Sequence, residues 1–128
     1  MKSKTTSSNL IELDRYRLRT LHDANFYSTL HEMSGPCLVI FTSAGCASCR
    51  AWKQVLLDYL QAHEPLTMFE VDAHESMALV SEYEVFHLPG LFLFKDGSFH
   101  SALQCEANID KLHMAISAAL RGPAQEEP

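Results

Sequence analysis

The sequence contains neither a long apolar run nor a cluster of basic residues. None of its apolar runs approaches the roughly 20 residues that a helix needs to cross a bilayer. Acidic residues outnumber basic ones, 16 to 10, and the formal net charge is −6. A nucleic-acid partner would require a basic surface, which this composition does not supply. We therefore expect neither a membrane nor a nucleic acid among the partners.

We also expect no secretory leader at the start of this sequence. Met1–Asn9 is polar and includes no apolar segment of the kind that a signal peptide requires. We therefore expect a cytoplasmic protein. In that reducing compartment the four cysteines are not expected to form a structural disulfide framework.

The size and composition are those of one globular domain. The chain has 128 residues, 47% of them hydrophobic, which is enough for a core. It shows no internal repeat and no linker. We assign residues 1–15 to a flexible N-terminal arm, residues 16–121 to the domain and residues 122–128 to an acidic C-terminal tail. The glutamates of the tail, Glu126 and Glu127, are interpreted as solvated.

Hydrophobic periodicity and turn signals predict the order β-α-β-α-β-α-β-β-α. The predicted elements are a strand at Arg17–Leu21, a helix capped by Asp23 that carries Phe26 to Met33, strand Cys37–Thr42, helix Ala47–His63, strand Leu66–Val71, helix Glu75–Tyr83, strand Leu91–Phe94, a turn at Lys95–Ser98, strand Phe99–Leu103 and helix Ile109–Leu120. Crossovers between the first strands imply parallel pairing, and the final hairpin implies antiparallel pairing. The predicted fold is α/β, with a central mixed sheet flanked by helices on both faces.

The most informative motif is the pair of cysteines in Cys46–Cys49. A predicted buried strand and a short turn precede the motif, so Cys46 is expected at the first turn of a helix. Unpaired backbone N–H groups and the helix dipole favour a thiolate there, and the thiolate is the nucleophilic form. Cys49 lies one turn further along the same face. One thiol that attacks and one that resolves are the minimum requirement for thiol–disulfide exchange.

A zinc site is the alternative interpretation of these cysteines. Cys37, Cys105 and seven histidines supply further possible ligands. Zinc ligands normally occur as two closely spaced pairs, and the sequence has no second pair. We therefore favour redox chemistry and expect no metal.

From about Arg17 to Leu120 the chain resembles the thioredoxin family. The segments that carry the resemblance are Leu38–Phe41, Cys46–Arg50, Glu70–Asp72, Tyr83–Pro89 and Leu91–Gly97. The separation of Cys46 from Pro89 is similar to that between the dithiol and the cis-proline of the family. A Cys-x-x-Cys motif alone is a weak signal, but this combination is specific. It implies a thioredoxin fold.

The resemblance implies a role for each matching residue. Cys46 corresponds to the attacking thiol, and Cys49 to the buried resolving thiol. Pro89 corresponds to the cis-proline that faces the dithiol. The backbone of Leu88 would pair with an extended substrate segment, a small-scale strand addition. Gly45 and Gly90, which flank the dithiol and the cis-proline, complete the implied substrate-binding residues.

The implied function is that of a thiol–disulfide oxidoreductase that reduces disulfides in protein substrates. The redox-active Cys46–Cys49 disulfide would carry the electrons without a further cofactor, and a separate reductase would donate them. Two alternatives remain open. One is a non-catalytic thioredoxin-like binding or chaperone module that uses the groove around Pro89. The other is a net disulfide oxidant or isomerase.

The chain departs from the family at four positions. The usual Gly-Pro between the cysteines is Ala47-Ser48, and the usual Trp before the first cysteine is Gly45. The usual buried Asp on the preceding strand is Ile40, and the residue after the cis-proline, often Thr, is Gly90. Ile40 cannot accept a proton, so we expect water or another side chain to deprotonate Cys49.

Four other residues receive structural interpretations. Cys37 and Trp52 are predicted to pack in the core. Cys105, in the loop before the last helix, is interpreted as a spectator, with a third thiol near the dithiol as the alternative. His87 is interpreted as a solvated loop residue, with tuning of the thiolate as the alternative.

Overall fold

The computed structural model describes residues 17–64 and 66–128, which form five strands and four helices. In chain order these are β1 (Leu18–Leu21), α2 (Phe26–His31), β2 (Pro36–Thr42), α3 (Ala47–Ala62), β3 (Thr67–Asp72), α4 (Met77–Glu82), β4 (Gly90–Lys95), β5 (Ser98–Leu103) and α5 (Ile109–Arg121). The predicted order is confirmed, and the predicted bounds shift by one or two residues, as is usual at element ends. The predicted N-terminal arm lies outside the described residues.

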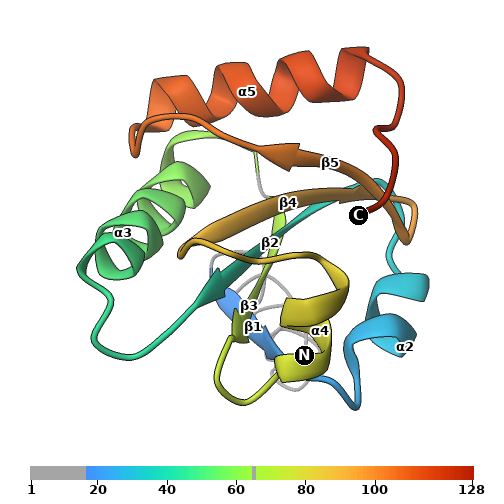
Figure 1. Ribbon diagram of the computed structural model, residues 1–128. Helices are drawn as coiled ribbons and strands as arrows, with labels where there is room; N and C mark the ends of the chain where they lie inside the picture. Colours follow the sequence, from blue (N-terminus) through green and yellow to red (C-terminus); the bar gives the residue numbers. More distant parts are fainter. Residues whose placement is uncertain (1–16, 65) are drawn as a thin grey trace, which may run out of the picture.

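All five strands form one mixed sheet in the order β1-β3-β2-β4-β5. β1 and β2 pair parallel with β3, whereas β4 is antiparallel to both β2 and β5. β2 is therefore the central strand, and the chain passes from its C-terminal end into α3 (Figure 1). The predicted α/β fold with a mixed sheet is confirmed.

Helices cover both faces of this sheet (Figure 1). Successive residues of β2 alternate between two hydrophobic clusters, Val39 and Phe41 in one, Leu38 and Ile40 in the other. α2 and α4 supply the first cluster with Phe26, Leu30 and Leu79. α3 and α5 supply the second with Trp52, Leu56, Leu112 and Ile116. β2 is therefore buried on both faces, as its continuous apolar run predicts.

Asp23 does not cap the helix that follows it. α2 begins at Phe26, and its N-cap residue is Asn25. Asp23 Oδ1 instead accepts a hydrogen bond from the backbone N–H of Leu79 at 3.3 Å. This N–H is one of the unpaired donors at the N-terminus of α4. The predicted capping role was wrong because the partner of Asp23 lies 56 residues further along the chain.

The turn between β4 and β5 is the one that the sequence predicts. Asp96 and Gly97 have φ values of 51° and 82°, the left-handed conformation that tight hairpin turns need. Asp96 Oδ1 accepts from the N–H of Gly35 at 2.7 Å, and the Asp96 N–H donates to the Gly35 carbonyl at 2.9 Å. The turn is thereby attached to the chain just before β2. A Cβ on Gly97 would lie only 2.9 Å from the carbonyl oxygen of Leu30.

Replacing Gly97 with alanine is expected to destabilise the protein by roughly 1–3 kcal/mol. The left-handed conformation costs an L-residue roughly 1–2 kcal/mol, and the close contact with the backbone of α2 adds an overpacking penalty. The measurement is the shift of the denaturant unfolding midpoint. Gly122→Ala is the control, because its Cβ would meet nothing closer than 3.8 Å and its φ is −95°. Equal shifts in the two variants would contradict this explanation.

The C-terminal residues are attached to the domain. Glu126 and Glu127 are exposed, as predicted, but the tail is not free in solvent. The Gln125 N–H donates to the carbonyl of His100 in the edge strand β5 at 2.7 Å. Glu127 accepts from the hydroxyl of Tyr83 at 3.1 Å. Burial, as the largest cause, raises the pKa of Tyr83, so this hydroxyl stays protonated and available as a donor.

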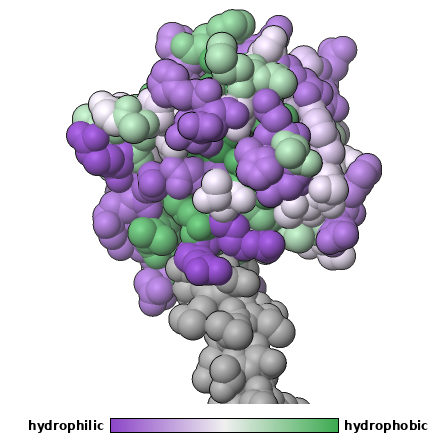
Figure 2. All heavy atoms as spheres, turned by 90° about the horizontal axis from the view of Figure 1, so that it is seen from below, coloured by the Kyte–Doolittle hydropathy of each residue, from purple (hydrophilic) through white to green (hydrophobic). Residues whose placement is uncertain are grey.

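Hydrophilic side chains dominate the surface seen in Figure 2, with smaller hydrophobic areas between them. The exposed large hydrophobic residues are Tyr27, Met77, Phe86 and Met114. Phe86, three residues before Pro89, is the most exposed of them, at 81%. Within residues 17–64 and 66–128, no helix is both long and apolar enough to span a bilayer.

Candidate active site

Cys46 lies at the junction between β2 and α3. β2 ends at Thr42, and Cys46 is the N-cap residue of α3. Its Sγ accepts a hydrogen bond from the backbone N–H of Cys49 at 3.1 Å, in the place of the side-chain oxygen that usually caps a helix. This N–H and the positive end of the helix dipole both favour negative charge on the sulfur. In the reduced protein, Cys46 is therefore expected to ionise more readily than a free thiol.

The two predicted cysteines form a disulfide but differ in exposure. Their Cα atoms are 5.2 Å apart, within the usual range of roughly 4.4–6.8 Å for such a bond. Cys46 is partly exposed, whereas Cys49 is only 1% exposed. A macromolecule can therefore approach Cys46, while Cys49 is shielded behind it.

Gly45 precedes Cys46 in an exposed turn. Its φ is 81°, and a Cβ there would meet nothing within 4 Å. The backbone conformation, rather than a lack of space, therefore favours glycine at this position. As a result, no side chain at this position covers Cys46.

The Leu88–Pro89 peptide bond is cis, as predicted. Gly90 begins β4 and pairs with Phe41, near the end of β2. The register therefore places Pro89 at the end of the sheet where β2 leads into the dithiol turn. All three residues of the predicted Leu88–Gly90 segment are partly buried.

Three of the four predicted substrate-binding residues line two separate pockets, and Leu88 lines neither of them. Pro89 and Gly90 line a pocket of about 330 Å³, which Phe86 also borders. Gly45 and Cys49 line another, of about 270 Å³. The active-site end of the sheet therefore has two pockets, one at the dithiol and one at the cis-proline.

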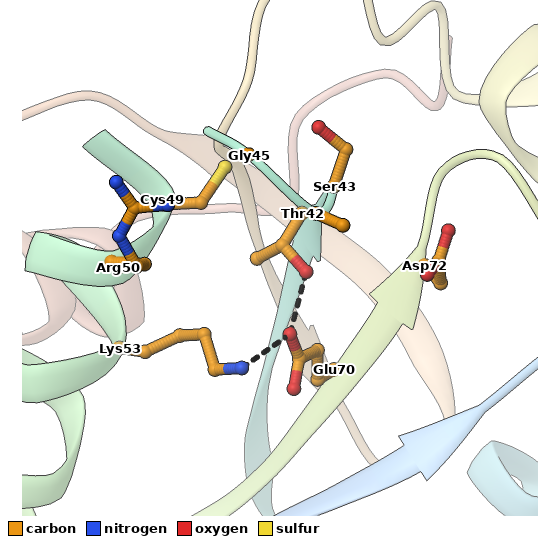
Figure 3. A pocket seen from close by; sticks show the side chains of 9 residues that line it. Thr42, Ser43, Gly45, Cys49, Arg50, Lys53, Glu70 and Asp72 are labelled. Carbon is orange, nitrogen blue, oxygen red and sulfur yellow. Dashed lines mark hydrogen bonds and ion pairs between the residues drawn. The ribbon is translucent and has the colours of Figure 1, made fainter. Parts of the chain in front are cut away.

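A polar cluster that the sequence analysis did not identify lines the second of these pockets (Figure 3). The hydroxyl of Thr42 donates to Glu70 Oε2 at 2.5 Å, and Lys53 Nζ lies 3.0 Å from the same oxygen. The three residues come from β2, β3 and α3, and they share the pocket with Cys49. The single local signal was a charged residue, Glu70, within the predicted apolar strand Leu66–Val71.

Two cysteines, Cys37 and Cys105, are free thiols. Burial raises the pKa of Cys37 to about 11, so this core residue stays protonated near neutral pH. Burial, and to a smaller extent the charge of Glu106, raises the pKa of Cys105. Cys105 is partly exposed and packs against the hydrophobic cluster beneath α3 and α5. Trp52 packs in that cluster, as predicted. In the described part of the chain, no three His, Cys, Asp or Glu side chains are grouped as metal ligands.

Fold and site together define a class of protein. The mixed sheet carries helices on both faces, and its central strand leads into a helix that begins at a disulfide of closely spaced cysteines. Unequal exposure of the two sulfurs and a helix N-terminus at the accessible one suit the exchange of disulfides. The chain is a thiol–disulfide oxidoreductase.

Comparison with known proteins gives the family. The model of the thioredoxin family matches residues 17–118. A thioredoxin from Alicyclobacillus acidocaldarius is 34% identical over 79 residues, which are 61% of this chain and 74% of that protein. Chloroplastic thioredoxin X from Arabidopsis thaliana is 28% identical over 97 residues, which are 75% of this chain but only 52% of that protein. The chain belongs to the thioredoxin family.

Solved structures show the same fold. The oxidized form of mitochondrial thioredoxin 3 from Saccharomyces cerevisiae superimposes with a TM-score of 0.67 at 23% sequence identity. The alignment covers 79% of this chain and 94% of the yeast chain. The thioredoxin fold predicted from the sequence is therefore confirmed.

Proposed function

We propose that this protein reduces disulfide bonds in other proteins by means of Cys46 and Cys49. The observation that carries the proposal is their disulfide at the N-terminus of α3, with Cys46 partly exposed and Cys49 buried. Only an accessible thiolate can attack a disulfide in a folded protein. Only a neighbour shielded from solvent can resolve the product without being trapped by a second substrate.

The reaction has two exchange steps. The Cys46 thiolate attacks one sulfur of the substrate disulfide, which forms a mixed disulfide and releases the other substrate sulfur as a thiolate that takes up a proton. Cys49 then loses its proton and attacks the Cys46 sulfur. The second substrate sulfur leaves as a thiolate, and the Cys46–Cys49 disulfide is formed. The substrate gains two electrons, and the protein loses two.

The substrate segment is proposed to bind beside the cis-proline. The backbone of Leu88 would pair with an extended segment, and Pro89 and Gly90 would form the floor of that groove. Gly45 would border the same segment next to Cys46. Each of these residues lines a pocket or lies partly exposed at this end of the sheet, which supports the assignment.

The dithiol itself is proposed to be the electron carrier, with no further cofactor. A separate reductase would return two electrons to Cys46–Cys49 after each turnover. The proposed compartment is the cytoplasm.

A redox titration combined with an activity assay tests this function. The protein is equilibrated in buffers of graded potential, and the thiols are counted after alkylation. A two-electron couple should change tenfold in ratio for every 30 mV or so. The protein should also reduce a disulfide-containing protein when a chemical reductant is supplied. A Cys46–Cys49 pair that never cycles, together with no reduction, would contradict the proposal. A potential well above that of the compartment would instead indicate a net oxidant or isomerase.

A further inference from the structure

The resolving cysteine needs a proton acceptor that the central strand does not provide. Cys49 is 1% exposed, so bulk solvent has little access to its thiol. A thiol must lose its proton before it can attack the Cys46 sulfur. Ile40, on the strand before the dithiol, is fully buried and apolar. The acceptor must therefore be water beside Cys49 or a side chain of another element that reaches it.

We propose that Glu70 accepts the proton of Cys49, through water in the pocket that the two residues share. This inference rests on the proposed function, because it assigns a residue to its second step. Glu70 and Cys49 both line the pocket of about 270 Å³ at the junction of β2, β3 and α3. Figure 3 shows Cys49, Thr42 and Glu70 following one another along its wall.

The sheet register directs Glu70 toward this site. Ile40 of β2 pairs with Glu70 of β3, so both side chains leave the sheet on the face that α3 covers. The Thr42 hydroxyl and Lys53 Nζ hold one carboxylate oxygen at 2.5 Å and 3.0 Å. The second oxygen makes no hydrogen bond or ion pair with the other described residues. One oxygen thus fixes the carboxylate, and the other can accept a proton.

The pocket has room for the intervening water. A polar cavity needs only about 10–15 Å³ of such space to hold one water molecule, which is far less than this one offers. The other charged residues that line it are Arg50, Lys53 and Asp72. Asp72 Oδ1 accepts from the backbone N–H groups of His74 at 2.8 Å and Glu75 at 3.2 Å, both within its own turn. Glu70 is instead held by Thr42 of β2 and Lys53 of α3, the strand that leads into the dithiol and the helix that carries Cys49. We therefore assign the proton acceptor to Glu70.

The proposed step is a proton transfer coupled to the second exchange. The S–H bond of Cys49 breaks, and its proton passes through water to the Glu70 carboxylate. The electron pair left on the Cys49 sulfur forms the bond to the Cys46 sulfur. The bond between Cys46 and the substrate sulfur breaks, and its electron pair leaves with the substrate. Glu70 later returns the proton to solvent through the same pocket.

The test follows the two exchange steps separately with the aromatic disulfide dithiobis-nitrobenzoate. Reduced protein releases one coloured thiolate when Cys46 attacks and a second when Cys49 resolves the mixed disulfide. A Cys105→Ser background removes the partly exposed third thiol. In Glu70→Gln, the first release should be unchanged, and the second should slow on the order of 10²-fold near pH 7, as expected for loss of a general base. The slowing should shrink as the pH is raised, because a rising hydroxide concentration increases the fraction of Cys49 that ionises without Glu70.

Two further variants separate proton transfer from other effects. Asp72→Asn removes a carboxylate from the same pocket and should leave the second release unchanged. Glu70→Asp keeps a carboxylate and should recover part of the rate. A purely electrostatic effect of Glu70→Gln would change the rate of the second release in the opposite direction. Removing a nearby negative charge favours the Cys49 thiolate and would speed that step.

Three results would overturn the inference: an unchanged second release in Glu70→Gln, equal slowing in Asp72→Asn, or slowing that does not diminish as the pH is raised. Failure of the wild-type protein to give the first release would instead contradict the proposed function, so the two failures are distinguishable. Unfolding midpoints of each variant show whether a lost rate reflects a lost fold.

Discussion

Cys46→Ser is expected to lower the rate of disulfide reduction by about 10³-fold or more, because the nucleophile at the accessible position is then lost. Cys46 is the partly exposed sulfur of the pair, and it caps α3 through the N–H of Cys49. A serine hydroxyl can accept the same hydrogen bond, so α3 should keep its cap. The hydroxyl does not ionise near neutral pH and cannot attack a disulfide. The measurement is the steady-state reduction of a protein disulfide, compared with the reduced wild-type protein.

Cys49→Ser is the matched variant, and its expected result is different. The first exchange should proceed, whereas the second should stop, so a stable mixed disulfide through Cys46 accumulates. Mass spectrometry of the trapped species would measure it as one substrate per protein. A binding or chaperone module would behave otherwise, because both variants would leave its substrate affinity intact and neither would trap a covalent complex. That outcome would favour the non-catalytic alternative.

Ile40→Asp is expected to destabilise the protein by about 3–5 kcal/mol near neutral pH, the scale of an unpaired charge left in a core. Ile40 is 0% exposed and packs among Trp52, Leu56 and the residues of α5. Burial disfavours the charged carboxylate and raises its pKa in the folded state. The measurement is the free energy of unfolding from denaturant titration at several pH values.

The pH dependence identifies the cause of that loss. Below about pH 3.9, the carboxyl is neutral in both folded and unfolded states, so no ionisation penalty applies. The penalty grows as the pH rises above that value and levels off above the raised pKa of the folded state. Ile40→Asn, which has a similar shape but no charge, should show no such trend. Parallel pH profiles for the two variants would contradict the explanation.

Ile40→Asp also bears on the role of Glu70. A carboxylate at Ile40 leaves β2 on the same face as Glu70, next to it in the register. We therefore expect it to recover part of the second-step rate that Glu70→Gln loses. No recovery in a double variant that still folds would show that the position of the carboxylate, and not its presence alone, decides the rate.

Much of this protein follows from patterns that are local in the sequence. The continuous apolar run Cys37–Thr42 predicts a strand buried on both faces, and its residues do enter two cores. The helix after Ala47 and the turn at Asp96 and Gly97 could also be predicted from the sequence. Side-chain periodicity and the residues of a left-handed turn are patterns that extend over only a few positions. The dithiol could be predicted for the same reason, since Cys46 and Cys49 are one helical turn apart.

Other features depend on which residues the folded chain brings together. Asp23 accepts a hydrogen bond from Leu79 of α4 instead of capping α2, and Glu127 accepts one from Tyr83, which is 44 residues away in the sequence. The cluster of Thr42, Lys53 and Glu70 joins three elements, and it exists only because the parallel register sets Glu70 opposite Ile40. A shift of one residue would turn Glu70 to the other face of the sheet. The sequence thus determined the fold and the dithiol by local pattern, whereas strand register and helix packing, which are long-range, decided what surrounds the buried thiol.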